Sequence, residues 1–283
     1  MENKKFFLIE DYKEMNILPD NIPIDDIEAY NRNSQHRFVY NRLFLMESQN
    51  IDAAPMGVNP PKFPVVKKTI YCLNNKNTDT LIGDVVSYND EIEDGFFWHT
   101  KIGGLSTFVD VMYNGEFIVF VNAYNYKERS YYQTIENFII PLEAENWIHK
   151  CLKGYKGIIN LEIKNDIIVD VRLTLGDLVH FYNYEFFDEI DNFFQGTKAT
   201  IDFDIESTTV FTLFIPSEAL EKFKENMLKY RRFFDKNSLV NSYLFLPEEE
   251  PDDIDDINVL FLETPHHQHG EEIIHLIRSD LGV

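Results

Sequence analysis

The chain has 283 residues, of which 44% are hydrophobic and 14% aromatic, so it can bury a large core and is too apolar for a disordered protein. Its formal net charge of −22 opposes binding to nucleic acid or to an anionic membrane surface. The sequence has no signal peptide, no apolar run of about eighteen residues and only two cysteines, Cys72 and Cys151, which predicts a soluble, reduced protein of the cytoplasm.

The N-terminal part is predicted to open with a loosely structured lead-in over residues 1–34, where prolines interrupt a polar sequence. Apolar residues at helical spacing then predict a helix over 33–49, with Asn33 or Ser34 as its N-cap. A proline-rich stretch follows, and the alternating, β-branched segment 64–73 is typical of a strand.

Two β-hairpins are predicted in the middle of the chain. In the first, strand patterns over 105–123 flank Asn114-Gly115, the preferred pair for a two-residue type I′ turn. In the second, residues 157–173 form two apolar strands that turn near residues 164–166.

The remaining segments show no alternation of strand and helix of the kind that a parallel sheet requires, so the pattern favours the α+β class. Helices are predicted for 141–152, 186–194 and 217–234 (capped by Ser217), an acidic solvated loop for 247–256, and strands for 257–262 and 272–278.

Three stretches in order, 34–68, 96–117 and 152–177, resemble the ATP-grasp superfamily. They match a basic helix followed by a lysine-bearing strand, a glycine-containing hinge before another strand, and a strand pair that carries acids. The resemblance implies an α+β fold of two subdomains whose antiparallel sheets face a nucleotide cleft. The implied division is a lead-in and helix at 1–60, a small subdomain at 61–130, a large subdomain at 131–246, and an acidic loop with C-terminal strands at 247–283.

The same resemblance implies that the protein binds ATP and Mg²⁺ and activates a small-molecule carboxylate by phosphorylation, for attack by an amine or thiol. Cations are needed at the polyphosphate. Lys68 aligns with the family lysine, with Lys67 on the opposite strand face as the alternative, and Arg42 aligns with the basic residue that opens the helix. His99 and Lys101 occupy the hinge region, where the family usually supplies a carboxylate for the ribose, and are the candidate nucleotide contacts there.

Glu162 and Asp170 match the family's pair of metal-binding acids, and Asp177 could add a further oxygen. A three-residue turn between the strands would put Glu162 and Asp170 on one face, whereas a two-residue turn would put them on opposite faces. Acids within apolar strands need partners, because burying an unpaired carboxylate is costly. The partner is either a metal ion or Arg172.

The sequence departs from the family pattern at several points of this site. Arg172 stands where the family has a neutral ligand, and it is the candidate catalytic side chain; Thr174 stands where the family has a catalytic arginine. Residues 73–81, which should form a glycine-rich phosphate loop, contain no glycine. The histidine-rich run 266–269 is expected to be solvated, with a Zn²⁺ site as the weaker interpretation.

Two functions follow and both stay open. The first is a Mg²⁺- and ATP-dependent carboxylate–amine or carboxylate–thiol ligase. The second is a catalytically degenerate ATP-grasp-fold protein with a binding or structural role, for which the Asn-, Lys-, Ile- and Phe-rich composition suggests a virus or its host symbiont as the source. An acidic adaptor of unrelated α+β fold is a third interpretation, and a homo-oligomer is compatible with each.

Overall fold

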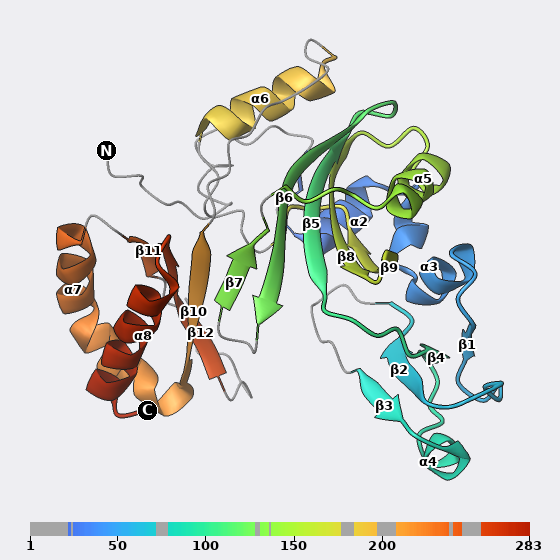
Figure 1. Ribbon diagram of the computed structural model, residues 1–283, viewed down its shortest axis with the longest axis horizontal. Helices are drawn as coiled ribbons and strands as arrows, with labels where there is room; N and C mark the ends of the chain where they lie inside the picture. The colour runs from blue at the N-terminus through green and yellow to red at the C-terminus, as the bar shows by residue number, and fades with distance from the viewer. Residues whose placement is uncertain are drawn as a thin grey trace. The chain divides into compact units, whose positions relative to one another are not determined.

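Figure 1 shows the fold of the chain as a computed structural model, which describes residues 22–23, 25–71, 79–127, 131–135, 137–176, 184–196, 208–237, 240–244 and 256–283. Helices accompany two sheets whose strand pairs are antiparallel, so the predicted α+β class is confirmed. The described residues form two compact units. Unit 1 takes in those of Tyr124–Asn137 and Asp204–Val283, and unit 2 those of Phe7–Ala123 and Phe138–Phe203.

Unit 2 contains a four-stranded sheet in the order β1-β4-β2-β3. Its strands are Ala53–Pro55 (β1), Val65–Thr69 (β2), Thr80–Ile82 (β3) and Phe96–Thr100 (β4). One side of this sheet packs its own small core, in which Val65 and Trp98 contact Tyr88 of helix α4 (Val85–Asp90). Since side chains alternate along a strand, Lys68 and His99 lie on the opposite side of the sheet.

The larger sheet contributes the strands Thr107–Tyr113 (β5), Gly157–Lys164 (β8), Ile167–Arg172 (β9) and the first part of Ile118–Lys127 (β6) to unit 2, in the order β6-β5-β8-β9. The predicted hairpin of β5 and β6 is present, but its turn is longer than a two-residue type I′ turn. The side-chain oxygen of Asn114 accepts hydrogen bonds from the amides of Glu116 and Phe117, at 3.1 and 2.8 Å. Asn114 therefore closes a four-residue loop with its side chain.

The N-terminal helices of unit 2 differ from the prediction. Part of the expected lead-in is a helix, Asp26–Arg32 (α2), whose N-cap Asp25 accepts the Glu28 amide at 2.7 Å. The expected helix over 33–49 is instead a 3₁₀ turn, Arg37–Tyr40 (η1), and a separate helix, Arg42–Ser48 (α3). The N-cap of α3 is Asn41, not Asn33 or Ser34, because Asn41 forms an isolated β-bridge with Tyr71 that interrupts the helix. The later helices of unit 2 are Leu142–Cys151 (α5) and Tyr184–Phe194 (α6), both near their predicted positions.

Unit 1 contains the strands Tyr131–Thr134 (β7), Thr209–Pro216 (β10), Asn241–Leu244 (β11) and Asp256–Thr264 (β12), in the order β11-β12-β10-β7, with the end of β6 beside β7. A 3₁₀ turn, Ser217–Ala219 (η3), leads into helix Leu220–Lys236 (α7); Ser217 therefore makes no side-chain cap, contrary to the prediction. Helix His267–Leu281 (α8) packs with α7 in one apolar core.

The predicted strand at 272–278 is wrong, because these residues lie within α8. Ile273, Ile277 and Leu281 are four residues apart and all buried, which is the spacing of one helix face. Gly270 lies on this helix where an added Cβ would overlap the Phe211 ring, so α8 approaches β10 closely. The prediction for 247–256 falls outside the described residues except for Asp256, the first residue of β12.

Candidate functional site

The β8–β9 hairpin brings the two predicted metal acids together by an unexpected route. Its turn consists of two residues, Asn165 and Asp166, with left-handed φ angles of 47° and 63°, as in a type I′ turn. Such a turn alone would put Glu162 and Asp170 on opposite faces. A bulge at Val169 restores the register, so that Glu162 lies directly opposite Asp170 on the same face.

Gln49, the C-cap residue of α3, holds this bulge. Its side-chain amide donates to the carbonyl of Ile168 at 2.7 Å, and its side-chain oxygen accepts the Ile168 amide at 2.9 Å. The side-chain amide of Gln49 thus bonds the backbone amide and carbonyl of Ile168 as a neighbouring strand would. Sequence reasoning did not identify Gln49, since its partner lies 119 positions away.

Arg42, a predicted phosphate ligand, and Asp170, a predicted metal ligand, are bonded to each other. Nη2 of Arg42 lies 2.6 Å from Oδ2 of Asp170, and Nε lies 3.3 Å from Oδ1. The Arg42 side chain is only 2% exposed, and its Nη1 also donates to Thr69 Oγ1 at 3.4 Å. Burial favours the neutral acid, but the charge and hydrogen bonds of Arg42 outweigh it and hold the pKa of Asp170 below its usual range.

The other acid of the pair, Glu162, contacts Ser106 and Lys164. Ser106, in the hinge segment, donates a hydrogen bond to Glu162 Oε1 at 2.6 Å, and Lys164 Nζ lies 3.2 Å from the same oxygen. Arg172, the candidate catalytic residue, has an acidic neighbour on α2: its Nε lies 3.6 Å from Oδ2 of Asp26. Both acids are therefore neutralised by protein cations.

The fold resemblance implies a magnesium ion at this face, and the side chains can be tested against it. Two opposed carboxylates are the ligand type that Mg²⁺ prefers. However, Arg42 uses both oxygens of Asp170, while Ser106 and Lys164 use one oxygen of Glu162. Across the described ranges, no group of three or more His, Cys, Asp or Glu side chains is arranged to hold a metal. Asp177 falls outside those ranges. The residues that the structure describes do not fit a protein-held Mg²⁺.

A third acid on this face, Asp110, was missed by the sequence reasoning. It is fully buried in β5 and accepts hydrogen bonds from Asn160 Nδ2 at 2.7 Å and from the Gly176 amide at 3.0 Å. Strand register places Asp110, Asn160 and Arg172 in one row across β5, β8 and β9. The signal was present in the sequence, because Asp110 interrupts the apolar run FVDVM just as Glu162 and Asp170 interrupt theirs.

Lys67 and Lys68 are both buried, on opposite faces of β2. Lys67 lies 2.9 and 3.1 Å from carboxylate oxygens of Glu91 and Glu93 and 4.5 Å from the Phe96 ring centroid. Lys68 lies 3.0 Å from Asp79. Of the two, Lys68 shares its face with His99, and its charge acts on both His99 and Asp170.

His99 is 4% exposed, and one of its ring nitrogens has no hydrogen-bond partner within the described part of the chain. Nδ1–H donates to the Thr100 carbonyl at 2.9 Å, whereas Nε2 has no hydrogen bond with any residue that the structure describes. Burial lowers the pKa of His99 from 6.5 to about 4, and the positive charges of Lys68 and Lys164 act in the same direction. His99 is thus a neutral imidazole near pH 7, with the lone pair of Nε2 available to a donor.

A cavity of about 350 Å³ lies at the hinge segment of unit 2. The hinge residues Thr100–Gly103, the segment Asn50–Asp52 and the hairpin residues Asn165 and Ile167 line it, and Lys101 is therefore one of its walls. This volume falls in the lower part of the range of about 300 to 1,000 Å³ for small-molecule sites.

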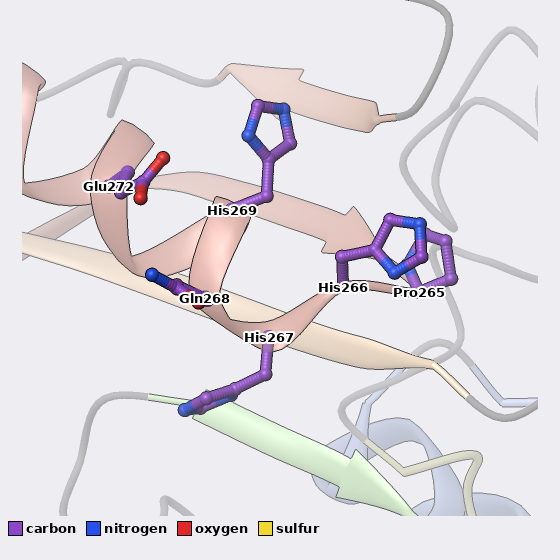
Figure 2. Close-up of a pocket in the computed structure, with 6 residues that line it drawn as sticks. All are labelled: Pro265, His266, His267, Gln268, His269 and Glu272. Atoms are coloured by element: carbon purple, nitrogen blue, oxygen red, sulfur yellow. The ribbon is translucent and has the colours of Figure 1, made fainter.

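A larger hollow, of about 640 Å³, lies over the histidine-rich run in unit 1 (Figure 2). The rings of His266, His267 and His269 point in different directions there. The His267 ring centroid lies 4.6 Å from that of Tyr131, and His269 Nε2 lies 3.0 Å from the side-chain nitrogen of Asn237. These rings do not converge on one point, so they do not form a metal site.

Comparison with known proteins gives structural likeness only. No protein-family model and no curated protein sequence matches the chain. The structure is similar to carboxyaminoimidazole ribonucleotide synthase from Aspergillus clavatus, solved with ATP, at a TM-score of 0.59, 10% identity and coverage of 88% of this chain and 74% of that one. It is similar to phosphoribosylamine–glycine ligase from Thermotoga maritima, at a TM-score of 0.55, 12% identity and coverage of 95% of this chain and 85% of that one. It is also similar to L-amino acid ligase from Bacillus licheniformis, at a TM-score of 0.51, 13% identity and coverage of 96% of this chain and 75% of that one. Identities this low establish a shared fold and leave the chemistry to be argued from the residues.

Proposed function

Since the chain has the ATP-grasp fold, we propose that it binds ATP in unit 2 and acts as an ATP-dependent ligase in the cytoplasm. Its substrates would be a small-molecule carboxylate and an amine or thiol, joined through an acyl phosphate. The observation that carries the proposal is the joint position of Lys68 and His99 on one face of the small sheet, together with the action of the Lys68 charge on Asp170 of β9.

The side chains of this face supply what a nucleotide needs. The buried ammonium group of Lys68 is a cation for the phosphates, with Lys67 as the alternative, and the free Nε2 of His99 can accept a hydrogen bond from a base or ribose donor. Lys101 lines the cavity at the hinge segment. Because the described acids do not fit a protein-held ion, Mg²⁺ enters this proposal only as the ion that accompanies ATP on its phosphates.

The reaction would proceed in two displacements. A carboxylate oxygen attacks the γ-phosphorus of ATP and ADP leaves; an amine or thiol then attacks the acyl carbon and inorganic phosphate leaves. Positive charge near the transferring phosphoryl group stabilises both the attack and the departure of ADP. Arg172, on the same face as Asp170, is the side chain proposed to serve this role.

A second function, ATP-grasp-fold binding without ligase chemistry, is favoured by one specific observation. Arg42 is bonded to Asp170 through both carboxylate oxygens. In addition, buried Thr174 stands where the family resemblance implies a catalytic arginine. A protein of this kind would bind a nucleotide without catalysing a reaction of it.

Release of ADP and phosphate from ATP distinguishes the two functions. The purified chain would be incubated with ATP, Mg²⁺ and pools of carboxylic acids, amino acids and thiols, with ADP measured by a coupled assay. ADP release that requires both a carboxylate and an amine or thiol is the expected result for a ligase. ATP binding in calorimetry without ADP release from any pool would support the binding protein instead.

A further inference from the structure

We infer that Arg42 holds the place of a divalent cation at the paired acids of the β8–β9 hairpin, so that the folded chain has no metal site there. The pair concerned is Glu162 and Asp170, which lie directly opposite each other. The inference concerns side chains of the chain itself, and it can be tested in the absence of nucleotide. Its failure is therefore distinguishable from a failure of the proposed function.

The position of the guanidinium group is fixed at both ends. Arg42 is the first residue of α3, and its backbone amide donates to the carbonyl of Ile70 at 2.8 Å. At the other end, Nη2 and Nε reach the two oxygens of Asp170, and Nη1 reaches Thr69 Oγ1. A buried arginine bonded in this two-pronged way cannot turn toward water without leaving both charges unpaired.

The charges around Asp170 also oppose a second cation. Besides Arg42, the positive charges of Arg172 and Lys68 act on Asp170. A divalent ion at this carboxylate would be repelled by all three of these positive charges. Removing Arg42 would free Oδ2 of Asp170 opposite Glu162, while Oδ1 would keep its hydrogen bond from the Val171 amide at 3.1 Å. Carboxylate oxygens are the ligands that a hard divalent cation prefers.

The test is a titration with Mn²⁺, a paramagnetic substitute for Mg²⁺, followed by electron paramagnetic resonance on nucleotide-free protein. The wild type is expected to show no stoichiometric Mn²⁺ site. Arg42→Gln is expected to bind Mn²⁺ about tenfold or more tightly than the wild type, because one neighbouring positive charge is gone. The double variant Arg42→Gln/Asp170→Asn is expected to lose that gain.

A matched control removes an arginine that does not face the acids. Arg37 donates to the carbonyl of Tyr30 at 2.7 Å and lies 4.7 Å from the centroid of its ring. Arg37→Gln makes the same change in net charge and is expected to leave Mn²⁺ binding as in the wild type. An equal gain in Arg37→Gln would show a general effect of charge and would overturn the inference.

Two further outcomes contradict the inference. One is a folded Arg42→Gln protein, checked by circular dichroism, that gains no Mn²⁺ binding. The other can be observed even if the Arg42 variants do not fold. A stoichiometric Mn²⁺ site in the wild type that Asp170→Asn abolishes would show that Asp170 is available to a metal ion.

Discussion

The pKa of His99 lies below its usual range because its imidazole is buried in β4, where the charged form loses its hydration. The cost of burial is tolerable because the ring is neutral and one nitrogen is bonded to a backbone carbonyl. Asp170, on β9 of the larger sheet, shows the opposite case: a largely buried group kept charged by a fixed partner. The site thus keeps one group neutral and one charged by controlling what each side chain contacts.

The pKa of His99 predicts how stability depends on pH. Below pH 6.5 the unfolded chain binds a proton at this residue, while the folded chain does not until about pH 4. The free energy of unfolding should therefore fall as pH drops from 6.5 to about 4, by an amount on the order of 3 kcal/mol from this residue. His99→Gln should flatten that slope in urea unfolding measured at several pH values.

The exposed His275, on α8, provides the control for this measurement. His275→Gln is expected to leave the slope unchanged. A slope between pH 6.5 and 4 that is the same in wild type and His99→Gln would show that the imidazole does not stay neutral in the fold. The stabilisation that Asp170 contributes does not affect this slope. Because its pKa is lowered, that stabilisation is lost only as pH falls below the ordinary carboxyl pKa, near pH 4.

At the scale of elements, the α3 helix and the β9 strand depend on each other. The bulge at Val169 decides whether Glu162 and Asp170 share a face, and Gln49 of α3 supplies the hydrogen bonds that the bulge leaves open. The same helix begins with Arg42, which bonds to Asp170, the residue that follows the bulge at Val169. One short helix therefore sets both the register of the hairpin and the charge of its acids.

Gln49→Ala should lower the free energy of unfolding by about 1–3 kcal/mol, because it leaves the amide and carbonyl of Ile168 without partners. Urea unfolding gives the value. Gln268, an exposed residue of α8, is the control, and Gln268→Ala should change stability little. A Gln49→Ala protein as stable as Gln268→Ala would mean that the bulge does not need the α3 contact.

The elements that sequence predicts well are those whose signals are local. Residues 141–152 and the β8–β9 hairpin were found because helix spacing and turn residues lie within the segment. The predicted strand at 272–278 failed because four apolar residues in seven fit a strand as readily as a buried helix face. The bulge could not be predicted, because the side chain that stabilises it belongs to another element.

At the scale of the whole molecule, the ATP-grasp fold was predicted from the order of three weak resemblances, none of which suffices alone. The likeness to solved structures at 10–13% identity confirms the fold. The candidate site is itself rich in acids, which lie on β5, β8 and β9. They contact Arg42, Lys164 and Asn160. Among the residues that the structure describes, none of the helices is long and apolar enough to cross a bilayer.

The central claim is that unit 2 binds ATP against Lys68, and a thermal unfolding series with ATP tests it most directly. ATP at about a hundredfold excess over Kd should stabilise the wild type by roughly 2.7 kcal/mol. That stabilisation should be lost in Lys68→Met and kept in Lys150→Met, a control at an exposed position on α5. No stabilisation of the wild type by ATP, or equal stabilisation of Lys68→Met, would contradict the account.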